Sequence, residues 1–135
     1  MNRIVLPAVL VVLFAPAIDV SASMEESVTN PFLSEYETPF EAPPFDKIEI
    51  EHYLPAFDTG LLLQNAEIRA IVEDASAPTF DNTIVALERS GALMTRVRNV
   101  LLNLSSADTN DELQEIVKDT QPRYARHKDD IRLNR

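Results

Sequence analysis

The sequence predicts an all-α fold, in which an extended N-terminal strap precedes about three antiparallel amphipathic helices. Stretches at residues 50–74, 79–104 and 109–135 repeat apolar side chains at the spacing of a helix that buries one face. The chain contains nine prolines, several of which precede or separate these stretches. No stretch alternates apolar and polar residues as a half-buried strand does, so no sheet is expected.

Residues 1–22 are interpreted as a signal peptide. Arg3 gives a positive start, an apolar run follows, and the triplet VSA ending at Ala22 fits the small-residue rule for cleavage. A cut after Ser23 and an uncleaved anchor are the alternatives, although the run is short for a membrane span and contains two prolines. The chain is therefore expected to be exported to the periplasm, without stable membrane association after cleavage.

Residues 23–46 are expected to form an extended strap across the folded body. Prolines block a helix there, and aromatic rings recur among them: Pro31, Pro39, Pro43 and Pro44, with Phe32, Tyr36, Phe40 and Phe45. A plain linker is rich in serine and glycine and poor in aromatics, so the rings favour a strap pinned to the body. The alternative is a disordered start of the mature chain, because termini are often loose.

The first helix is predicted over residues 50–74. Glu49 and Glu51 place negative charge at its start, where the helix dipole favours it. Pro55 falls within the opening turns and is tolerated there, and the helix must end before Pro78. Its apolar positions are Tyr53, Leu54, Phe57, Leu61, Ile68, Ile71 and Val72.

The second helix is predicted from about Thr79, capped by Thr79 with Asn82 or by Asp81, and ends at residues 105–108. Gly91 lies in the middle of its stripe and is expected to let another helix approach closely, at a propensity cost of about 1 kcal/mol. The stripe contains Ile84, Leu87, Met94, Val97, Leu101 and Leu104, and is widened by Val85, Leu93 and Val100.

The third helix is predicted to start with a capping box, in which Thr109 caps and Glu112 reaches back. Pro122 must kink or split this helix, because it removes a backbone hydrogen bond and clashes with the preceding turn. No stop signal precedes Arg135, so the helix is expected to be cut short. Its apolar positions are Leu113, Ile116, Val117, Tyr124 and Ile131.

Composition excludes several function classes. The chain has 22 acidic and 12 basic residues, a net charge of −10 and two histidines. Such an acidic chain is a poor candidate for binding nucleic acid or anionic membrane. The absence of cysteine excludes disulfides, thiol catalysis and thiolate metal sites.

Neither histidine is predicted to be catalytic or a metal ligand. His52 has Pro55 and Ala56 where a helix would place a second ligand, so a packing or surface role is favoured. His127 has Asp130 three residues on, but a catalytic pair would also need a nucleophile. A position on the helix surface is therefore expected for His127.

The remaining polar clusters have structural explanations. Residues 108–112 are acidic enough to suggest calcium, but they lack the glycine and distal glutamate of an EF-hand, so helix capping is favoured. The glycosylation-like triplet at Asn103 lies within a predicted helix and is treated as incidental. Arg89, Arg96 and Arg98 are expected to form a solvated face. No catalytic, cofactor-binding or metal-binding residue is assigned in this chain.

Three blocks carry a resemblance to a known family: TPFEAPPFDKIEIEHYLPAF at residues 38–57, PTFDNTIVALERSG at 78–91, and NLSSADTNDEL at 103–113. The chain from Asn30 to Asn134 resembles the N-terminal region of bacterial zinc metallopeptidases of the thimet oligopeptidase family, of the peptidyl-dipeptidase and oligopeptidase A type. One departure is Ile50, where relatives often have proline at the helix start.

The resemblance implies an almost wholly helical peptidase, of which this chain is a partial domain lining a substrate channel for short peptides. It also implies a zinc ion held by an HExxH motif and a downstream glutamate. His52 is followed by Tyr53 and His127 by Lys128, so neither begins that motif. The zinc ligands are therefore expected outside this chain, and the chain alone is expected to be inactive.

The alternative is an exported helical module that binds peptides or a partner protein without hydrolysis. Without the rest of the peptidase, one helical face is expected to remain apolar, so that the isolated chain is marginally stable or self-associates. A monodisperse chain would favour the stand-alone module.

Overall fold

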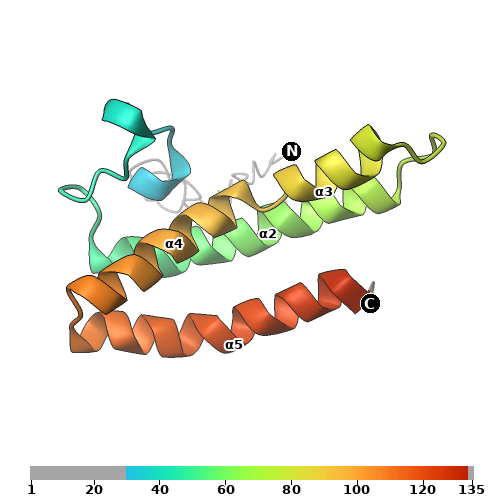
Figure 1. Cartoon of the computed structure of the whole chain (residues 1–135). Helices are drawn as coiled ribbons and strands as arrows, with labels where there is room; N and C mark the ends of the chain where they lie inside the picture. The colour runs from blue at the N-terminus through green and yellow to red at the C-terminus, as the bar shows by residue number, and fades with distance from the viewer. Residues whose placement is uncertain (1–29, 134–135) are drawn as a thin grey trace, which may run out of the picture.

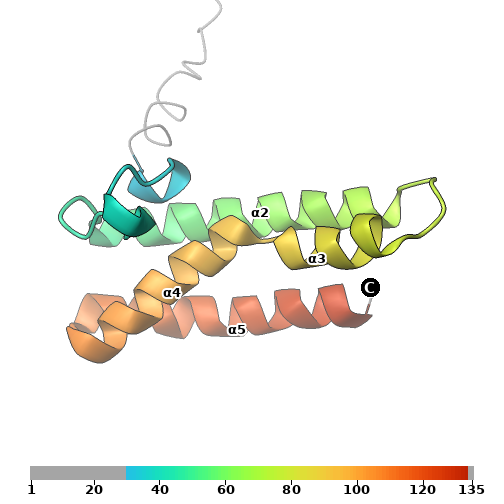
Figure 2. The same cartoon turned by 45° about the horizontal axis from the view of Figure 1, so that its top comes forward.

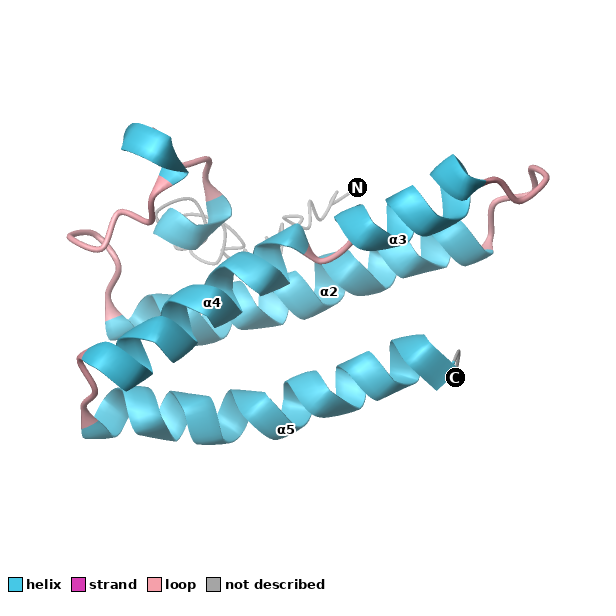
Figure 3. Cartoon of the chain, viewed as in Figure 1, coloured by secondary structure: helices cyan, strands magenta, loops and turns pink. Residues whose placement is uncertain are grey.

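The computed structural model describes residues 30–133; the predicted signal peptide, residues 1–22, and the first part of the predicted strap lie outside them. The described residues form helices and loops without a strand, which confirms the all-α prediction (Figure 3). Within this range, no helix combines the length and apolarity needed to cross a membrane.

Three helical rods run in alternating directions (Figure 1). The first is α2 (Tyr53–Val72), and the second comprises η4 (Phe80–Val85), α3 (Ala86–Arg89) and α4 (Ala92–Ala107). The third is α5 (Asp111–Leu133). α4 packs against both α2 and α5, and Figures 1 and 2 show α5 lying alongside the other two rods.

The core lies where α2, α4 and α5 meet. Tyr53, Phe57, Met94 and Val97 are almost completely buried there. Burial of each such side chain contributes about 1.5–3 kcal/mol to the stability of the fold. This packing stabilises helices that would be only marginally stable in isolation. The other buried core residues are Phe32, Ala56, Val100, Leu101, Leu113 and Ile116.

Gly91 lies close to α2 as predicted, against the side chain of Gln64, and a second close approach occurs between Gly60 of α2 and the backbone of α4. A Cβ atom on Gly60 would lie 3.2 Å from both the N and Cα atoms of Met94. Only a residue without a side chain lets α2 and α4 approach this closely. Gly60 therefore accounts for the contact between the first two rods.

The prediction of one continuous second helix is wrong. The Thr79–Asn82 capping box is present, but the first turns are a π-helix and the rod breaks at Ser90 and Gly91 (Figure 3). Gly91 has a φ of 73°, in the left-handed region that glycine enters without strain. The backbone N–H of Gly91 donates to Glu67 Oε2 on α2 at 2.7 Å, so a side chain from another rod stabilises the break.

The break also divides the predicted apolar stripe. Met94, Val97 and Leu101 after the break are buried, whereas Ile84 and Leu87 before it are about 45% exposed. The segment before the break contacts the far end of α2 and is not enclosed by α5. The stripe therefore serves as core only in α4.

α5 begins one residue later than predicted. Asn110, not Thr109, is the cap, because Asn110 Oδ1 accepts the backbone N–H of Leu113 at 2.8 Å. Thr109 Oγ1 instead accepts a hydrogen bond from Gln114 Nε2 at 2.6 Å. The helix continues through Pro122 without being split, and Figure 1 shows it curving gently.

The strap contacts the body through its first part. It contains two short helical turns, η1 (Pro31–Leu33) and η2 (Pro39–Glu41). A third turn, η3 (Ile50–His52), leads directly into α2 and forms the start of the predicted first helix. Phe32 is fully buried, with its ring centroid 5.2 Å from that of Tyr53. Phe40 and Phe45 are exposed, so only part of the predicted set of rings pins the strap.

Candidate functional site

The two histidines lie at different places and have structural partners. His52 Nδ1 accepts the backbone N–H of Glu49 at 2.9 Å, closing a capping box at the start of η3. The carbonyl of His52 accepts a hydrogen bond from Asn30 Nδ2 at 2.9 Å. His52 therefore organises the helix start and holds the strap, in line with a packing role.

His127 is buried, which corrects the prediction of a surface position. It is 7% exposed and lies between α5 and α2, with Nε2 2.9 Å from Gln64 Oε1. Burial lowers the pKa of His127 below its ordinary value, and the nearby Asp130 carboxylate opposes this effect. The imidazole is therefore favoured in its neutral form, donating from Nε2 to the glutamine oxygen.

These partners do not form catalytic machinery within the described range. Neither histidine is hydrogen-bonded to a hydroxyl nucleophile, and residues 30–133 contain no cluster of three or more metal-ligating side chains. The acidic residues 108–112 include the cap Asn110, in line with the capping interpretation. The residues present do not fit a zinc site, so no reaction step is assigned to them.

Two of the three arginines predicted to form a solvated face instead make tertiary contacts. Arg96 Nη1 donates to the carbonyls of Phe32 at 3.1 Å and Ser34 at 3.0 Å, and its guanidinium lies 4.8 Å from the Tyr36 ring centroid. Arg98 stacks on Tyr124 at 4.6 Å. Neither partner was predictable from the sequence, because both lie far along the chain from the arginine that they contact.

Two tyrosine hydroxyls, one from the strap and one from the start of α2, are buried. The Oη atoms of Tyr36 and Tyr53 are buried without a protein hydrogen-bond partner. Burial raises the pKa of Tyr53 to about 12, with a smaller contribution from Tyr36, and also raises the pKa of Tyr36 against the opposing charge of Arg96. Both phenols are therefore held in the neutral form and are not available as bases.

A third arginine joins α5 to α2. Arg123 forms ion pairs with Asp119 on its own helix, at 3.0 Å, and with Asp58 on α2. Its guanidinium also lies 5.0 Å from the ring centroid of Phe57. The hydrogen bond to Asp58, and to a smaller extent the one to Asp119, raise the pKa of Arg123, so the guanidinium stays charged. This contact fixes the packing of the two rods next to the core.

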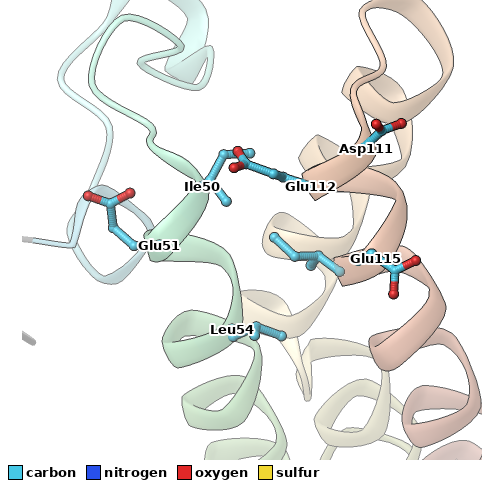
Figure 4. A pocket seen from close by; sticks show the side chains of 7 residues that line it. Ile50, Glu51, Leu54, Asp111, Glu112 and Glu115 are labelled. Carbon is cyan, nitrogen blue, oxygen red and sulfur yellow. The ribbon is translucent and has the colours of Figure 1, made fainter.

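An open hollow lies where α2 and α5 both begin, and we call it the helix-start hollow. Its volume is about 460 Å³, and its floor is formed by Ile50, Leu54 and Ile116. Glu51, Asp111, Glu112 and Glu115 also line it. Figure 4 shows Ile50 and Leu54 facing the gap, with Glu112 reaching across it toward Ile50.

The arrangement at the hollow is suited to binding rather than to bond cleavage. Its lining is mainly apolar, and the carboxylates of Glu51 and Glu115 point away from each other in Figure 4. Carboxylates that diverge cannot share a proton or jointly coordinate a metal ion. Sequence reasoning missed this hollow because the two helix starts that form it are about 60 residues apart in the chain.

In comparisons with known proteins, this helical chain is similar to segments of peptidases. No protein-family model matches it. It is 46% identical over 106 residues to a dipeptidyl carboxypeptidase of Salmonella typhimurium strain LT2, and 47% identical over 105 residues to one of Escherichia coli strain K12. It is 32% identical over 95 residues to oligopeptidase A of Escherichia coli strain K12.

These matches cover much of this chain and little of the relatives. The two dipeptidyl carboxypeptidase matches each cover 78% of the chain but only 16% and 15% of the relatives. The oligopeptidase A match covers 70% of the chain and 13% of that relative. The chain is therefore a homologue of a segment of these peptidases, which confirms the resemblance to the thimet oligopeptidase family.

Proposed function

We propose that this chain is the N-terminal, substrate-channel portion of a zinc metallopeptidase that cleaves short peptides, of the dipeptidyl carboxypeptidase or oligopeptidase type. The observation that carries the proposal is the identity of 46–47% to two dipeptidyl carboxypeptidases over 78% of the chain. In this proposal the zinc, its ligands and the catalytic base come from other parts of the enzyme, and these residues form part of the scaffold.

The test is a chimera. Residues 30–133 replace the matching segment of the Escherichia coli dipeptidyl carboxypeptidase, and cleavage of a short synthetic peptide is measured. The chimera is expected to retain activity, whereas the same enzyme with the segment deleted and the 135-residue chain alone are expected to be inactive. Chelator-sensitive peptide cleavage by the chain alone, or a folded chimera without activity, would contradict the proposal.

The second candidate is a helical module that binds peptides or a partner protein without hydrolysis. The helix-start hollow favours it, because a recess lined mainly by apolar side chains is a binding feature that needs no metal. The nucleotide sequence following the codon for Arg135 separates the two candidates. A continuing reading frame that encodes HExxH supports the peptidase, and a stop codon supports the module.

Export to the periplasm is also part of the proposal. It is supported by the positive start, apolar run and small-residue triplet of residues 1–22. Expression of the chain in a Gram-negative host, followed by N-terminal sequencing of the periplasmic fraction, is expected to give a product that starts at Ser23. An unprocessed chain in the cytoplasm would contradict it.

A further inference from the structure

The short turn η2 presents an aromatic ring to solvent. Phe40 lies at its centre and is fully exposed, so its ring packs against nothing else in residues 30–133. In Figure 1 this turn, drawn in teal, lies apart from the three rods. Phe32 of the same strap is fully buried, with its ring beside that of Tyr53. The strap therefore has one ring that fastens it to the rods and another that is free to bind elsewhere.

The backbone at Phe40 is unfavourable but well defined. Phe40 and Glu41 have φ values of 61° and 55°, in a region that glycine and asparagine occupy far more readily. The backbone N–H of Glu41 donates to the carbonyl of Thr38 at 3.1 Å. The N–H of Ala42 donates to the carbonyl of Pro39 at 3.3 Å, and the Thr38 hydroxyl donates to the carbonyl of Ala42. Local hydrogen bonds therefore hold the ring in its exposed orientation.

Strain of this kind and an exposed ring together indicate a binding role. Residues in sparsely populated backbone regions are concentrated at sites that bind or clamp another group. Aromatic side chains dominate the energetics of interfaces, and a ring that is already oriented loses less entropy when it binds. Pro39, Pro43 and Pro44 restrict the same segment further. The turn is thus suited to insert one aromatic side chain into an apolar pocket.

The length of the relatives indicates where this pocket lies. The matches leave 84% and 85% of the two dipeptidyl carboxypeptidases outside the aligned segment. We propose that Phe40 anchors the strap by inserting into an apolar pocket on the part of the peptidase that lies outside residues 30–133. This inference rests on the proposed function. The strap then joins two bodies, with Phe32 packed against the rods and Phe40 packed against the remainder of the enzyme.

The test uses the chimera described above and the protease Glu-C, which cleaves after glutamate. Glu41 lies in the turn, and Glu73, exposed at the end of α2, is the internal reference. Mass spectrometry follows both bonds. In the 135-residue chain both are expected to be cleaved. In the folded chimera, cleavage after Glu41 relative to cleavage after Glu73 is expected to fall about tenfold or more, because docking of Phe40 closes the turn to the protease.

Phe40→Asn is the decisive variant, because asparagine suits the left-handed backbone and removes the ring. In the chimera it is expected to restore cleavage after Glu41. Its effects on thermal unfolding should also have opposite signs: the midpoint of the isolated chain rises by about 2–8 °C, whereas that of the chimera falls. Phe45→Asn, which removes the other exposed ring of the strap, is the control and should leave Glu41 protected.

Equal cleavage after Glu41 in the isolated chain and the folded chimera overturns the inference, and so does protection that persists in Phe40→Asn. Peptide cleavage by the chimera reports on the proposed function separately, so an active chimera with an unprotected turn refutes this inference alone. If the full exchange does not fold, exchanging residues 38–46 alone allows the same comparison of Phe40 with asparagine. Protection that appears in the isolated chain as its concentration rises, and is lost in Phe40→Asn, identifies a second copy as the occupant and refutes the inference.

Discussion

Burial of His127 links a single side chain to the acid stability of the core. Its imidazole lies between α5 and α2 against Gln64, and burial lowers its pKa despite the neighbouring Asp130. In the unfolded chain the histidine titrates at its ordinary value of about 6.5. Below that pH the unfolded state binds the proton more readily, so the free energy of unfolding falls with the pH.

The prediction is that wild-type stability declines as the pH is lowered from about 7.5 to 5.5, and that His127→Gln declines less. Urea unfolding followed by circular dichroism at several pH values measures this difference. His52→Gln is the matched control and should keep the wild-type dependence, because it leaves His127 in place. Equal pH dependence in the wild type and His127→Gln would show that this histidine is not responsible.

Phe40 combines an unfavourable backbone with a fully exposed ring. Phe40 and Glu41 have φ values of 61° and 55°, in the left-handed region, and the ring makes no packing contact that reduces its exposure. A non-glycine residue in the left-handed region costs the folded state roughly 1 kcal/mol of stability, whereas asparagine tolerates this conformation better. The native side chain at this position therefore costs the isolated chain stability.

Phe40→Asn is expected to raise the free energy of unfolding by about 0.5–1 kcal/mol, measured by urea unfolding. The control Phe45→Asn also removes an exposed ring, but not at a left-handed position, and should change stability by less than about 0.5 kcal/mol. An equal gain in both variants would attribute the effect to the exposed rings rather than to the backbone.

At the scale of elements, the break before α4 depends on contacts between rods. Gly91 adopts a left-handed conformation, donates to Glu67, and lies so close to Gln64 that a Cβ atom would overlap its amide. Gln64 is also the partner of His127. Gln64 on α2 therefore contacts both the break at Gly91 and His127 on α5.

Gly91→Ala is expected to destabilise the chain by about 2–4 kcal/mol, through the left-handed backbone and the overlap with Gln64. In the background of Gln64→Ala the same substitution should cost about 1–2 kcal/mol, because only the backbone contribution remains. Equal costs in both backgrounds, measured by urea unfolding, would disprove the steric part of this account.

The elements that were predictable are those specified by local sequence. Helical periodicity located all three rods, and the Thr79–Asn82 box is present because cap and partner are three residues apart. The break at Gly91 was not predictable, because a glycine within an apolar stripe fits either a helix interior or a stop. The choice depends on Glu67 and Gln64, which lie on another rod.

The remaining misses have similar causes. Thr109 and Asn110 are both good caps, and the choice between them depends on which register points Leu113 and Ile116 into the core. Thr120 and His127 lie on the buried face of α5, yet their polarity removed them from the predicted stripe. Counting positions at helical spacing regardless of polarity would have identified both. The helix-start hollow was not predictable, because the sequence does not show which helix starts are adjacent in space.

At the scale of the whole molecule, apolar surface remains exposed over several elements, including Leu62 and Val72 on α2, Phe80 on η4 and Leu133 on α5. The chain spans about one-sixth of the dipeptidyl carboxypeptidases it matches. We expect the isolated chain to self-associate, with an apparent mass by light scattering that rises with concentration. A monodisperse monomer with a cooperative thermal transition would contradict this expectation.

The strap is held to the body through Arg96. Replacing it in Arg96→Met keeps an apolar stem but removes the hydrogen bonds to Phe32 and Ser34 and the contact with Tyr36. Global stability is expected to fall by about 1–2 kcal/mol, and limited proteolysis within residues 34–47 should accelerate. Arg89→Met, at an exposed position, is the control. Unchanged proteolysis in Arg96→Met would show that Phe32 and Asn30 hold the strap without Arg96.

The atoms that anchor the strap also determine how its sequence can diverge. Arg96 binds main-chain carbonyls, and Asn30 binds the carbonyl of His52, so these contacts do not depend on the exposed side chains at Ser34 and Glu35. Related sequences can therefore change at those positions while the backbone keeps its path. In this part of the chain, low sequence similarity between homologues would underestimate their structural similarity.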